Sequence, residues 1–359
     1  MSIRAFPRRH YSHVKSCKSL IAYGSLSSRP ALKHTLCLTC LYSIDYSSEV
    51  CNLLTIPEWT PDKWRDVPEN PLIDPPGGPK PGNVIGDPQV IPPGEYDEYW
   101  HMFAHAGRTI YHLRSSDGIH WRYEETLPWP GCLVYLYKEK GIWYMVYTLP
   151  DEKWNTRICI RESRNLKEWS DEVVLLEPQL PWECEGPFKQ VRNPCLIRTG
   201  DGTYRLYYSA GTILLEDCGY EEPKYISFAE SDDIYGPYKH YGKPIISPDP
   251  KVSYRNFGAG ALKVYRWRDQ YIGFNNGIYK DEKDRSRSAI CLMASLDGIS
   301  WIDAPFNPII PPTSGWKRAL VYQLDVVFGY EEKIIIYYNA RDGWREGVER
   351  IGASILVEE

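Results

Sequence analysis

The chain has 359 residues and a formal net charge of −5, so it carries no basic surplus for binding nucleic acid. Aromatic residues make up 14% of it, together with 29 Pro and 27 Gly, which is typical of an all-β protein with many short strands and turns. No apolar run approaches the length that spans a membrane. We therefore expect a soluble protein with a neutral small-molecule partner, and no binding to nucleic acid or membrane.

The first 55 residues differ in composition from the rest. Up to His34 the segment contains seven Lys or Arg and no acidic residue, a bias shared by transit peptides and disordered tails. The stretch from Ser19 to Leu32 is interrupted by polar residues and proline, which argues against a secretory signal. We expect residues 1–55 to be disordered or a mis-assigned start, and residues 56–359 to form the folded domain.

Cysteine usage indicates a reducing compartment. Cys37 and Cys40 form a single CxxC, with Cys17, Cys51 and His34 as possible further zinc ligands. Without a regularly spaced second pair, this motif is weak evidence for a metal. The remaining cysteines are scattered through apolar segments, so we expect buried thiols, a cytoplasmic location and no metal or other cofactor.

From Trp59 onward a repeat organises the chain. The innermost strands of the repeating units are predicted to start near five residues, Asp87, Cys132, Asn193, Ala259 and Gln323. An aromatic second strand follows each of them, and third strands end in turns such as Ser116-Asp117-Gly118, where Asp-Gly acts as a turn former. This spacing predicts an all-β, five-bladed β-propeller with four-stranded blades.

An outer-strand motif indicates how the ring closes. Asn70-Pro71-Leu72-Ile73, Lys243-Pro244-Ile245-Ile246 and Asn307-Pro308-Ile309-Ile310 each look like an edge strand, where proline is tolerated. The last unit lacks this motif, whereas the first copy precedes the first unit. We therefore expect Pro71 to Asp74 to supply the outer strand of the last blade, which removes an exposed edge.

Three motifs carry a resemblance to a known group of proteins. Gly86-Asp87-Pro88, Arg192-Asn193-Pro194 and Glu185-Gly186-Pro187, together with the five units, resemble the five-bladed propeller glycoside hydrolases of families 43, 62, 32, 68, 117 and 130. The resemblance covers about Trp59 to Glu359 and is strongest to family 43. It implies cleavage of arabinosides, xylosides, fructosides or mannosides. It also implies an Asp on the first blade as base or nucleophile, an auxiliary Asp on the third blade and a Glu as proton donor.

Asp87 matches the first of these roles. Asn193 stands at the third-blade position, so the auxiliary charge is missing there, and the fourth-blade start, Asn256 to Gly260, contains no glutamate. Cleavage of a glycosidic bond normally needs one ionised and one protonated carboxyl group. We expect Asp87 to be the ionised one.

The proton donor is predicted from two neighbouring acids, Glu183 and Glu185, which precede the third inner strand. Close carboxyl groups beside Trp182 and Pro187 raise each other's pKa through repulsion and desolvation. Glu185 is preferred because Glu185-Gly186-Pro187 resembles the donor motif of family 43, although Glu183-Cys184 resembles one in family 32. A solvated loop position is the alternative interpretation for Glu185.

Further residues near the predicted funnel are expected to bind the sugar: Arg192, Asn193, Gln323, Asp325, Arg318, Trp182 and His105. Asp325 is a possible substitute for the missing auxiliary carboxylate. Arginines suit hydroxyl, carboxylate or phosphate groups, and their alternative role is pairing with a structural acid. Turn capping by Asp87 and a core position for His105 are the corresponding alternatives for these two residues.

Three functions remain open at this stage. The first is a glycosidase that removes a terminal sugar, because deep funnels suit chain ends. The second is a glycoside phosphorylase resembling family 130, with phosphate held by Lys189, Arg192, Arg255 and Arg318. The third is a carbohydrate-binding propeller without catalytic acids. The sequence leaves the sugar, the anomer and the oligomeric state open.

Overall fold

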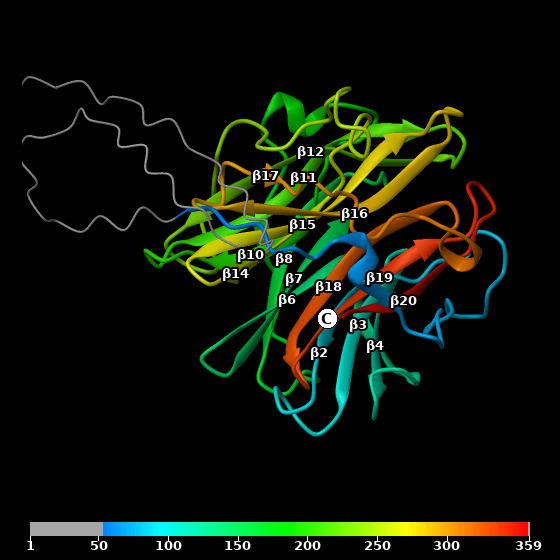
Figure 1. Ribbon diagram of the computed structural model, residues 1–359. Helices are drawn as coiled ribbons and strands as arrows, with labels where there is room; N and C mark the ends of the chain where they lie inside the picture. The colour runs from blue at the N-terminus through cyan, green and yellow to red at the C-terminus, as the bar shows by residue number, and fades with distance from the viewer. Residues whose placement is uncertain (1–52, 358–359) are drawn as a thin grey trace, which may run out of the picture. The chain divides into compact units, whose positions relative to one another are not determined.

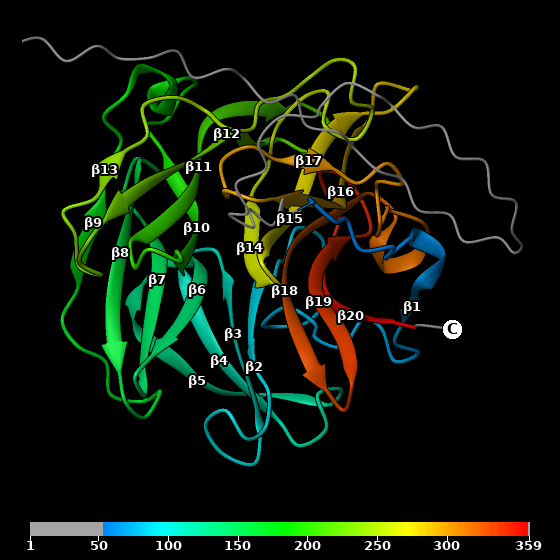
Figure 2. The ribbon, with the colours of Figure 1, turned by 60° about the vertical axis from the view of Figure 1, so that its left-hand side comes forward.

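The computed structural model describes residues 53–357. The chain divides after Leu54, and the second unit, Thr55–Glu359, holds twenty strands in five four-stranded antiparallel sheets. The sheets are arranged in a ring (Figure 1, Figure 2), which confirms the predicted five-bladed propeller. The expectations for residues 1–52, including the CxxC motif, lie outside the described residues. No helix within the described range is long and apolar enough to cross a membrane.

Blades one to four each use four consecutive strands. Blade one contains β2 (Gly86–Ile91), β3 (Trp100–Ala106), β4 (Thr109–Ser115) and β5 (Trp121–Pro130). Blade two contains β6 (Cys132–Glu139), β7 (Ile142–Pro150), β8 (Thr156–Ser163) and β9 (Val173–Leu176). Blade three contains β10 (Val191–Arg198), β11 (Tyr204–Leu215), β12 (Tyr220–Ser231) and β13 (Lys239–His240). Blade four contains β14 (Leu262–Trp267), β15 (Gln270–Lys280), β16 (Ser286–Ser295) and β17 (Ile302–Asp303).

Blade five combines both ends of the folded unit. It contains β18 (Leu320–Tyr330), β19 (Lys333–Arg341), β20 (Glu349–Leu356) and, outermost, β1 (Trp64–Asp66). Three short 3-10 helices complete the described elements: η1 (Pro61–Lys63), η2 (Pro181–Cys184) and η3 (Gly315–Lys317). Closure by an N-terminal strand is therefore confirmed. The strand is Trp64–Asp66, however, and Pro71 to Asp74 contributes only a bridge between Ile73 and Ile351.

A side-chain amide explains why the proline motif bridges without forming a strand. Asn70 donates to the carbonyl of Ala353 (2.7 Å) and accepts from the amide of the same residue (2.9 Å). Asn307 forms the equivalent pair with Leu292, at 2.8 and 2.7 Å. The side-chain amide of the asparagine thus makes the two hydrogen bonds that a strand residue would make through its backbone. The proline that follows has no N–H and cannot donate one of them.

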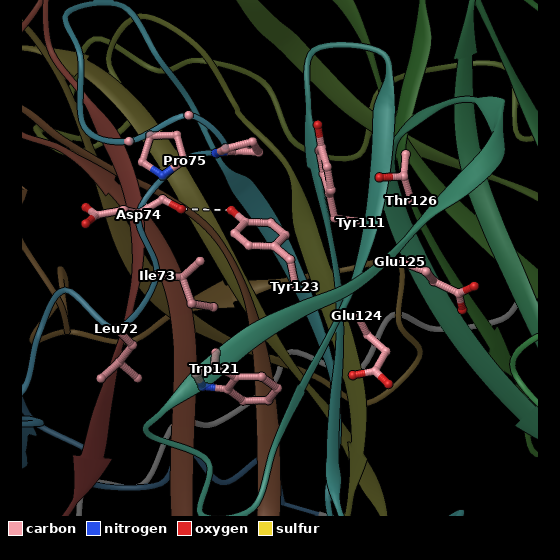
Figure 3. Close-up of a pocket in the computed structure, with 13 residues that line it drawn as sticks. Leu72, Ile73, Asp74, Pro75, Tyr111, Trp121, Tyr123, Glu124, Glu125 and Thr126 are labelled. Atoms are coloured by element: carbon pink, nitrogen blue, oxygen red, sulfur yellow. Dashed lines mark hydrogen bonds between the residues drawn. The ribbon is translucent and has the colours of Figure 1, made fainter.

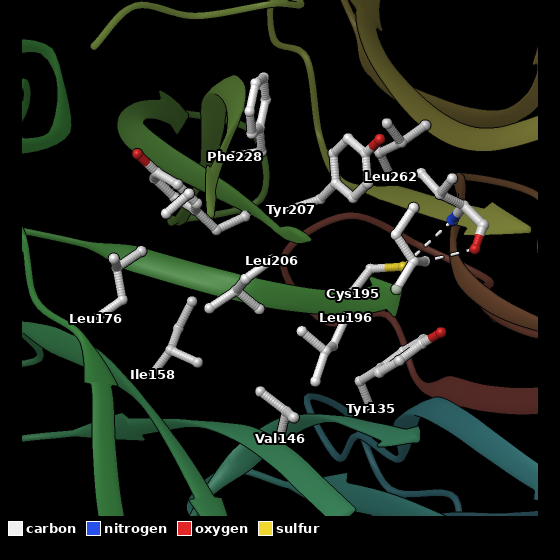
Figure 4. Close-up of a cluster of buried hydrophobic side chains, with 14 of the residues drawn as sticks. Tyr135, Val146, Ile158, Leu176, Cys195, Leu196, Leu206, Tyr207, Phe228 and Leu262 are labelled. Carbon is white, nitrogen blue, oxygen red and sulfur yellow. Dashed lines mark hydrogen bonds between the residues drawn. The ribbon is translucent and has the colours of Figure 1, made fainter. Parts of the chain in front are cut away.

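The core lies between neighbouring blades. Between blades two and three, Val146 and Ile158 pack with Leu196 and Leu206 and are fully buried (Figure 4). Cys195 completes this layer, and its sulfur accepts a hydrogen bond from the amide of Val264 at 3.3 Å. The six cysteines within the described residues are all free thiols.

Four of the five inner strands have an irregularity near their start, where the register with the second strand of the blade shifts. Registers shift between Gly86 and Gln89 and between Arg192 and Cys195, and a comparable shift occurs in β6 and β18. Bulges of this kind re-aim one side chain. Asp87, Leu133 and Asn193 occupy the bulge with φ of 53, 51 and 53°, a left-handed conformation that Asp and Asn adopt more readily than other non-glycine residues.

Candidate active site

The funnel at the starts of the inner strands contains a cavity of about 280 Å³. Each of the five blades contributes to its wall. Three carboxyl groups line it, those of Asp87, Glu222 and Glu349. Three basic side chains also line it, namely His105, Arg192 and Arg341. A small concave site with a few convergent polar groups is the usual form of a small-molecule site.

Asp87 is held by both its backbone and its side chain. Its amide donates to Oδ1 of Asn339 in blade five at 3.1 Å. A Cβ on the preceding Gly86 would lie 2.7 Å from both Asn339 and Glu349, so only glycine permits this approach. The bulge and the glycine together fix Asp87 at the cavity wall.

His105 is the side-chain partner of Asp87. Its Nε2 lies 2.8 Å from Oδ2 of Asp87, and its Nδ1 lies 3.1 Å from the carbonyl of Gly107. Both partners accept hydrogen bonds, so both ring nitrogens donate and the ring is an imidazolium. Burial lowers the pKa of His105, but the hydrogen bond and charge of Asp87 outweigh burial and raise it.

Glu222 reaches the cavity from a hairpin that projects over the funnel. β11 and β12 continue to pair as far as Leu215 and Tyr220, whereas β10 pairs with β11 only as far as Ala210. We call residues 211–224 the arch hairpin. Its tip packs against blade five, where Leu215 and Cys218 join a cluster with Leu320 and Tyr322. Packing against the opposite side of the ring thus carries Glu222 over the cavity.

Further contacts tie the arch hairpin to its surroundings. The hydroxyl groups of Tyr220 and Tyr322 hydrogen-bond across the funnel. At the base of the hairpin, the amide of Gly260 in blade four donates to the carbonyl of Pro223 at 3.2 Å. These contacts join blades three, four and five around Glu222.

The Glu222 carboxyl group has an unusual environment. Burial raises the pKa of Glu222, the charge of Arg192 lowers it, Glu349 and Asp87 raise it and Arg341 lowers it, and together these effects raise the pKa to about 7. Among the described residues, none forms a hydrogen bond or an ion pair with this carboxyl group. A carboxyl group that is protonated near neutral pH and free to donate is suited to general acid catalysis.

Glu349 differs from Glu222 because its oxygens are engaged. Asn339 donates to its Oε1 at 2.6 Å, and Arg341 lies 3.8 Å from its Oε2. Burial raises the pKa of Glu349, the charge of Arg341 lowers it, and the charge of Asp87 raises it. We infer a structural role for Glu349, since it links Asp87 and Arg341 through Asn339.

Glu183 and Glu185, predicted as proton donors, do not line this cavity. Glu183 is fully buried and accepts hydrogen bonds from Tyr208 and His240 at 2.5 and 2.7 Å. Glu185 is exposed, pairs with Lys224, and accepts a hydrogen bond from Tyr225 at 2.9 Å. Glu183 therefore links its loop to β11 and β13, and Glu185 braces the base of the arch hairpin.

Of the predicted sugar-binding residues, four line the cavity: His105, Arg192, Asn193 and Gln323. Asp325, Arg318 and Trp182 do not line it. Asp325 accepts hydrogen bonds from the amide of Val90 (2.7 Å) and the hydroxyl of Tyr265 (2.8 Å), which joins blades one, four and five. Arg318 donates to the carbonyl of Asp342, and Trp182 stacks on Tyr208 at 6.0 Å.

A second cavity of about 550 Å³ lies at the outer side of blade one (Figure 3). Its acids are engaged by their own blade, since Glu124 pairs with Arg122 at 3.3 Å and Glu125 with His112 at 3.1 Å. Tyr123 donates to the carbonyl of Asp74 at 2.8 Å. No inner strand reaches this cavity, so the smaller funnel is the better candidate for chemistry. Within residues 53–357, no group of three or more His, Cys, Asp or Glu could hold a metal ion.

Comparisons with known proteins support the architecture. No protein-family description and no curated protein matches the sequence. Solved structures do match. A glycosyl hydrolase from Bacteroides ovatus aligns at 15% identity with a TM-score of 0.60, covering 83% of this chain and 95% of the other. A thermostable family-43 glycoside hydrolase aligns at 16% identity and a TM-score of 0.58, covering 78% and 92%.

A third matching structure belongs to a protein with a different activity. It is an N-acetylgalactosamine deacetylase from F. plautii in complex with blood group B trisaccharide, at 12% identity and a TM-score of 0.57, covering 76% and 89%. At these identities the likeness establishes the fold. Function must be argued from the site.

Proposed function

We propose that the chain is a glycoside hydrolase that removes a terminal sugar held in the funnel, with Asp87 as base or nucleophile and Glu222 as proton donor. One observation carries the proposal. The funnel holds an Asp paired with an imidazolium and, nearby, an unpaired Glu whose pKa is raised to about 7. Such a difference between two carboxyl groups is what glycoside hydrolysis requires.

The proposed steps use only these two groups and water. Glu222 donates its proton to the glycosidic oxygen as the bond from that oxygen to the anomeric carbon breaks. Asp87 either takes a proton from the attacking water or attacks the anomeric carbon itself. In the second route, water that gives its proton to the now ionised Glu222 then cleaves the glycosyl ester and releases the sugar from Asp87. Proton NMR of the first-formed anomer separates the two routes, because direct attack by Asp87 retains the configuration and attack by water inverts it.

The cavity volume supports a single sugar unit, since about 280 Å³ lies at the lower end of small-molecule sites. The matched structures support carbohydrate chemistry, because two are described as hydrolases and one was solved with a trisaccharide. A cytoplasmic location stays a prediction that rests on the free thiols.

Phosphorolysis is the second candidate, and it receives less support from the geometry. Of the four predicted phosphate ligands, only Arg192 lines the cavity. Arg255 is paired with Asp303 at 2.7 Å, and Arg318 is exposed. Incubating the protein with a panel of aryl glycosides and oligosaccharides, with and without phosphate, tests both ideas. We expect turnover that does not need phosphate. Turnover only with phosphate would select phosphorolysis, and sugar binding without turnover would select a binding protein.

A further inference from the structure

Two of the three basic side chains in the funnel have a carboxylate partner, and the third, Arg192, has none among the described residues. Asp87 pairs with His105 at 2.8 Å, and Glu349 with Arg341 at 3.8 Å. Arg192 has no carboxylate within ion-pair distance among the described residues. Its one hydrogen bond runs to the carbonyl of Glu221 at 3.4 Å, and its Nε is buried without a partner.

An unpaired arginine in a cavity is energetically unfavourable. Burying a charge without a partner costs free energy unless a ligand supplies the opposite charge. Arg192 is half-buried, and burial lowers its pKa, which is the expected direction for a cation held partly away from water. The adjacent Asn193, which also lines the cavity, carries no charge that would repel an anion.

When Glu222 is protonated, no negative charge in the funnel balances the positive charge of Arg192. A proton donor is neutral before the reaction, so Glu222 contributes no charge at that stage. Asp87 and Glu349 are balanced by His105 and Arg341, and Arg192 remains as one excess positive charge. Guanidinium groups bind carboxylate and sulfate through paired hydrogen bonds.

We propose that the funnel selects an acidic sugar, whose carboxylate or sulfate substituent binds Arg192. This inference rests on the proposed function, because it concerns the same site. It differs from the neutral partner expected from the net charge of the whole chain, since the charge balance inside the funnel is local. Arg192 is then the residue that determines specificity.

Anion binding at Arg192 has a second consequence. Arg192 is the main neighbouring charge that lowers the pKa of Glu222, and Arg341 acts in the same direction. Asp87 and Glu349 act in the opposite direction, and Tyr220 and Tyr322 also line the site. A substrate anion that neutralises Arg192 therefore raises the pKa of Glu222 further. The alkaline limb of kcat lies at higher pH for an acidic substrate than for a neutral one.

The test uses matched 4-nitrophenyl glycosides that differ only at C6, namely a glucuronide, a glucoside and a xyloside, and the galacturonide, galactoside and arabinopyranoside set. We expect kcat/KM to be at least tenfold higher for a uronide than for its neutral partners. Arg192→Gln should lower kcat/KM at least tenfold more for the uronides than for their neutral partners and so remove this preference, and Arg192→Lys should restore part of it. Arg122→Gln, on an exposed residue of β5, is the control and should change neither class.

Binding to the Asp87→Asn variant separates this inference from the hydrolase assignment. Calorimetry with glucuronate and galacturonate, against glucose and galactose, should show binding of an acid sugar that Arg192→Gln weakens at least tenfold. If the acid sugar binds in this way but the unmodified protein turns over none of the glycosides, the hydrolase assignment is wrong and this inference remains. Turnover of neutral glycosides at least as fast as that of the uronides, with a uronide-to-neutral ratio that Arg192→Gln leaves unchanged, would overturn this inference and leave the hydrolase. Addition of inorganic phosphate distinguishes an acidic group on the sugar from free phosphate as the anion at Arg192. Turnover that depends on phosphate would assign Arg192 to a phosphate co-substrate and overturn the proposal.

Discussion

Nε2 of His105 lies 2.8 Å from Oδ2 of Asp87, on a β-strand pair at the funnel wall. The pKa of His105 is raised by this contact in spite of burial. A group whose pKa is higher in the folded state stabilises the fold fully below its unfolded pKa, about 6.5 for histidine. That stabilisation is lost as the pH rises through the folded-state pKa.

We therefore predict a pH-dependent effect of His105→Gln. The variant should lower the free energy of unfolding by about 1.5–3 kcal/mol near pH 5.5, the range for hydrogen bonds to charged groups. The difference from the unmodified protein should shrink toward pH 9. Urea denaturation at several pH values measures it, and a difference that stays constant with pH would contradict the imidazolium assignment.

The second prediction concerns ring closure through Asp66 of β1. Its carboxylate accepts hydrogen bonds from Lys317 (2.8 Å), Tyr338 (3.0 Å) and Ser354 (2.7 Å). Burial raises the pKa of Asp66, but these partners outweigh it and lower the pKa, so this stabilisation is present above the unfolded pKa and is lost in acid. Asp66→Ala should lower the free energy of unfolding by about 1–2 kcal/mol at pH 7, because buried Lys317 loses its partner while solvent screens the exposed side of Asp66.

Asp62→Ala is the matched control for this closure test. Asp62 lies on the same N-terminal segment, is exposed, and interacts with the neighbouring Thr60. We expect a change below about 0.5 kcal/mol, as for other surface substitutions. Equal losses for both variants would show that β1 does not fasten the ring.

The third prediction concerns the base of the arch hairpin. Gly211 and Gly107 have similar φ values, 63 and 57°. A Cβ on Gly211 would lie 2.9 Å from the ring of Tyr225 and 3.0 Å from the carbonyl of Trp182, whereas a Cβ on Gly107 meets nothing within 4 Å. Both alanine variants carry backbone strain of about 1–2 kcal/mol. Gly211→Ala adds overpacking of about 1–3 kcal/mol.

Thermal melts and kcat/KM should therefore separate these two variants. Gly211→Ala is expected to melt lower than Gly107→Ala and to lose at least tenfold in kcat/KM, because the hairpin that carries Glu222 shifts. Gly107→Ala should lose stability with little change in kcat/KM. Similar activities in the two variants would argue against the hairpin as the element that positions the donor.

The fourth prediction follows from the protonated state of Glu222. Since burial raises its pKa to about 7, kcat/KM should fall above about pH 7 as the donor ionises. The fall should disappear in Glu222→Gln with an aryl glycoside whose leaving group needs little protonation. Persistence of the same alkaline limb in Glu222→Gln would assign the limb to another group.

Much of the fold follows from local signals in the sequence. Turns such as Ser116-Asp117-Gly118 carry their own chemistry, since Asp117 accepts from the amides of Ile119 and His120 at 2.9 and 2.8 Å. Asp87 was located because its motif marks the start of an inner strand. The exact closing strand was missed, because Trp64–Asp66 is too short to show a pattern.

The sequence around Glu222, the proposed proton donor, gives no comparable signal. Glu222 lies on a hairpin whose extension over the funnel depends on Leu215 and Cys218 packing against blade five. That contact joins residues about a hundred positions apart, and no local periodicity reports it. The alternation of Tyr220 and Glu222 at the start of β12 is a weak clue that both face one side. Glu185 had the more familiar motif, yet its neighbours Lys224 and Tyr225 occupy its carboxylate.

The most direct test of the account compares three substitutions on whichever glycoside the unmodified protein cleaves. Asp87→Asn should fold and lose several orders of magnitude in kcat, as removal of an essential catalytic group does. Glu222→Gln should lose a similar factor on natural oligosaccharides and much less on aryl glycosides with good leaving groups. Glu185→Gln, the isosteric control on an acid outside the cavity, should change kcat less than about threefold. A loss of kcat in Glu185→Gln that depends on the leaving group, with Glu222→Gln unaffected, would contradict the proposed site.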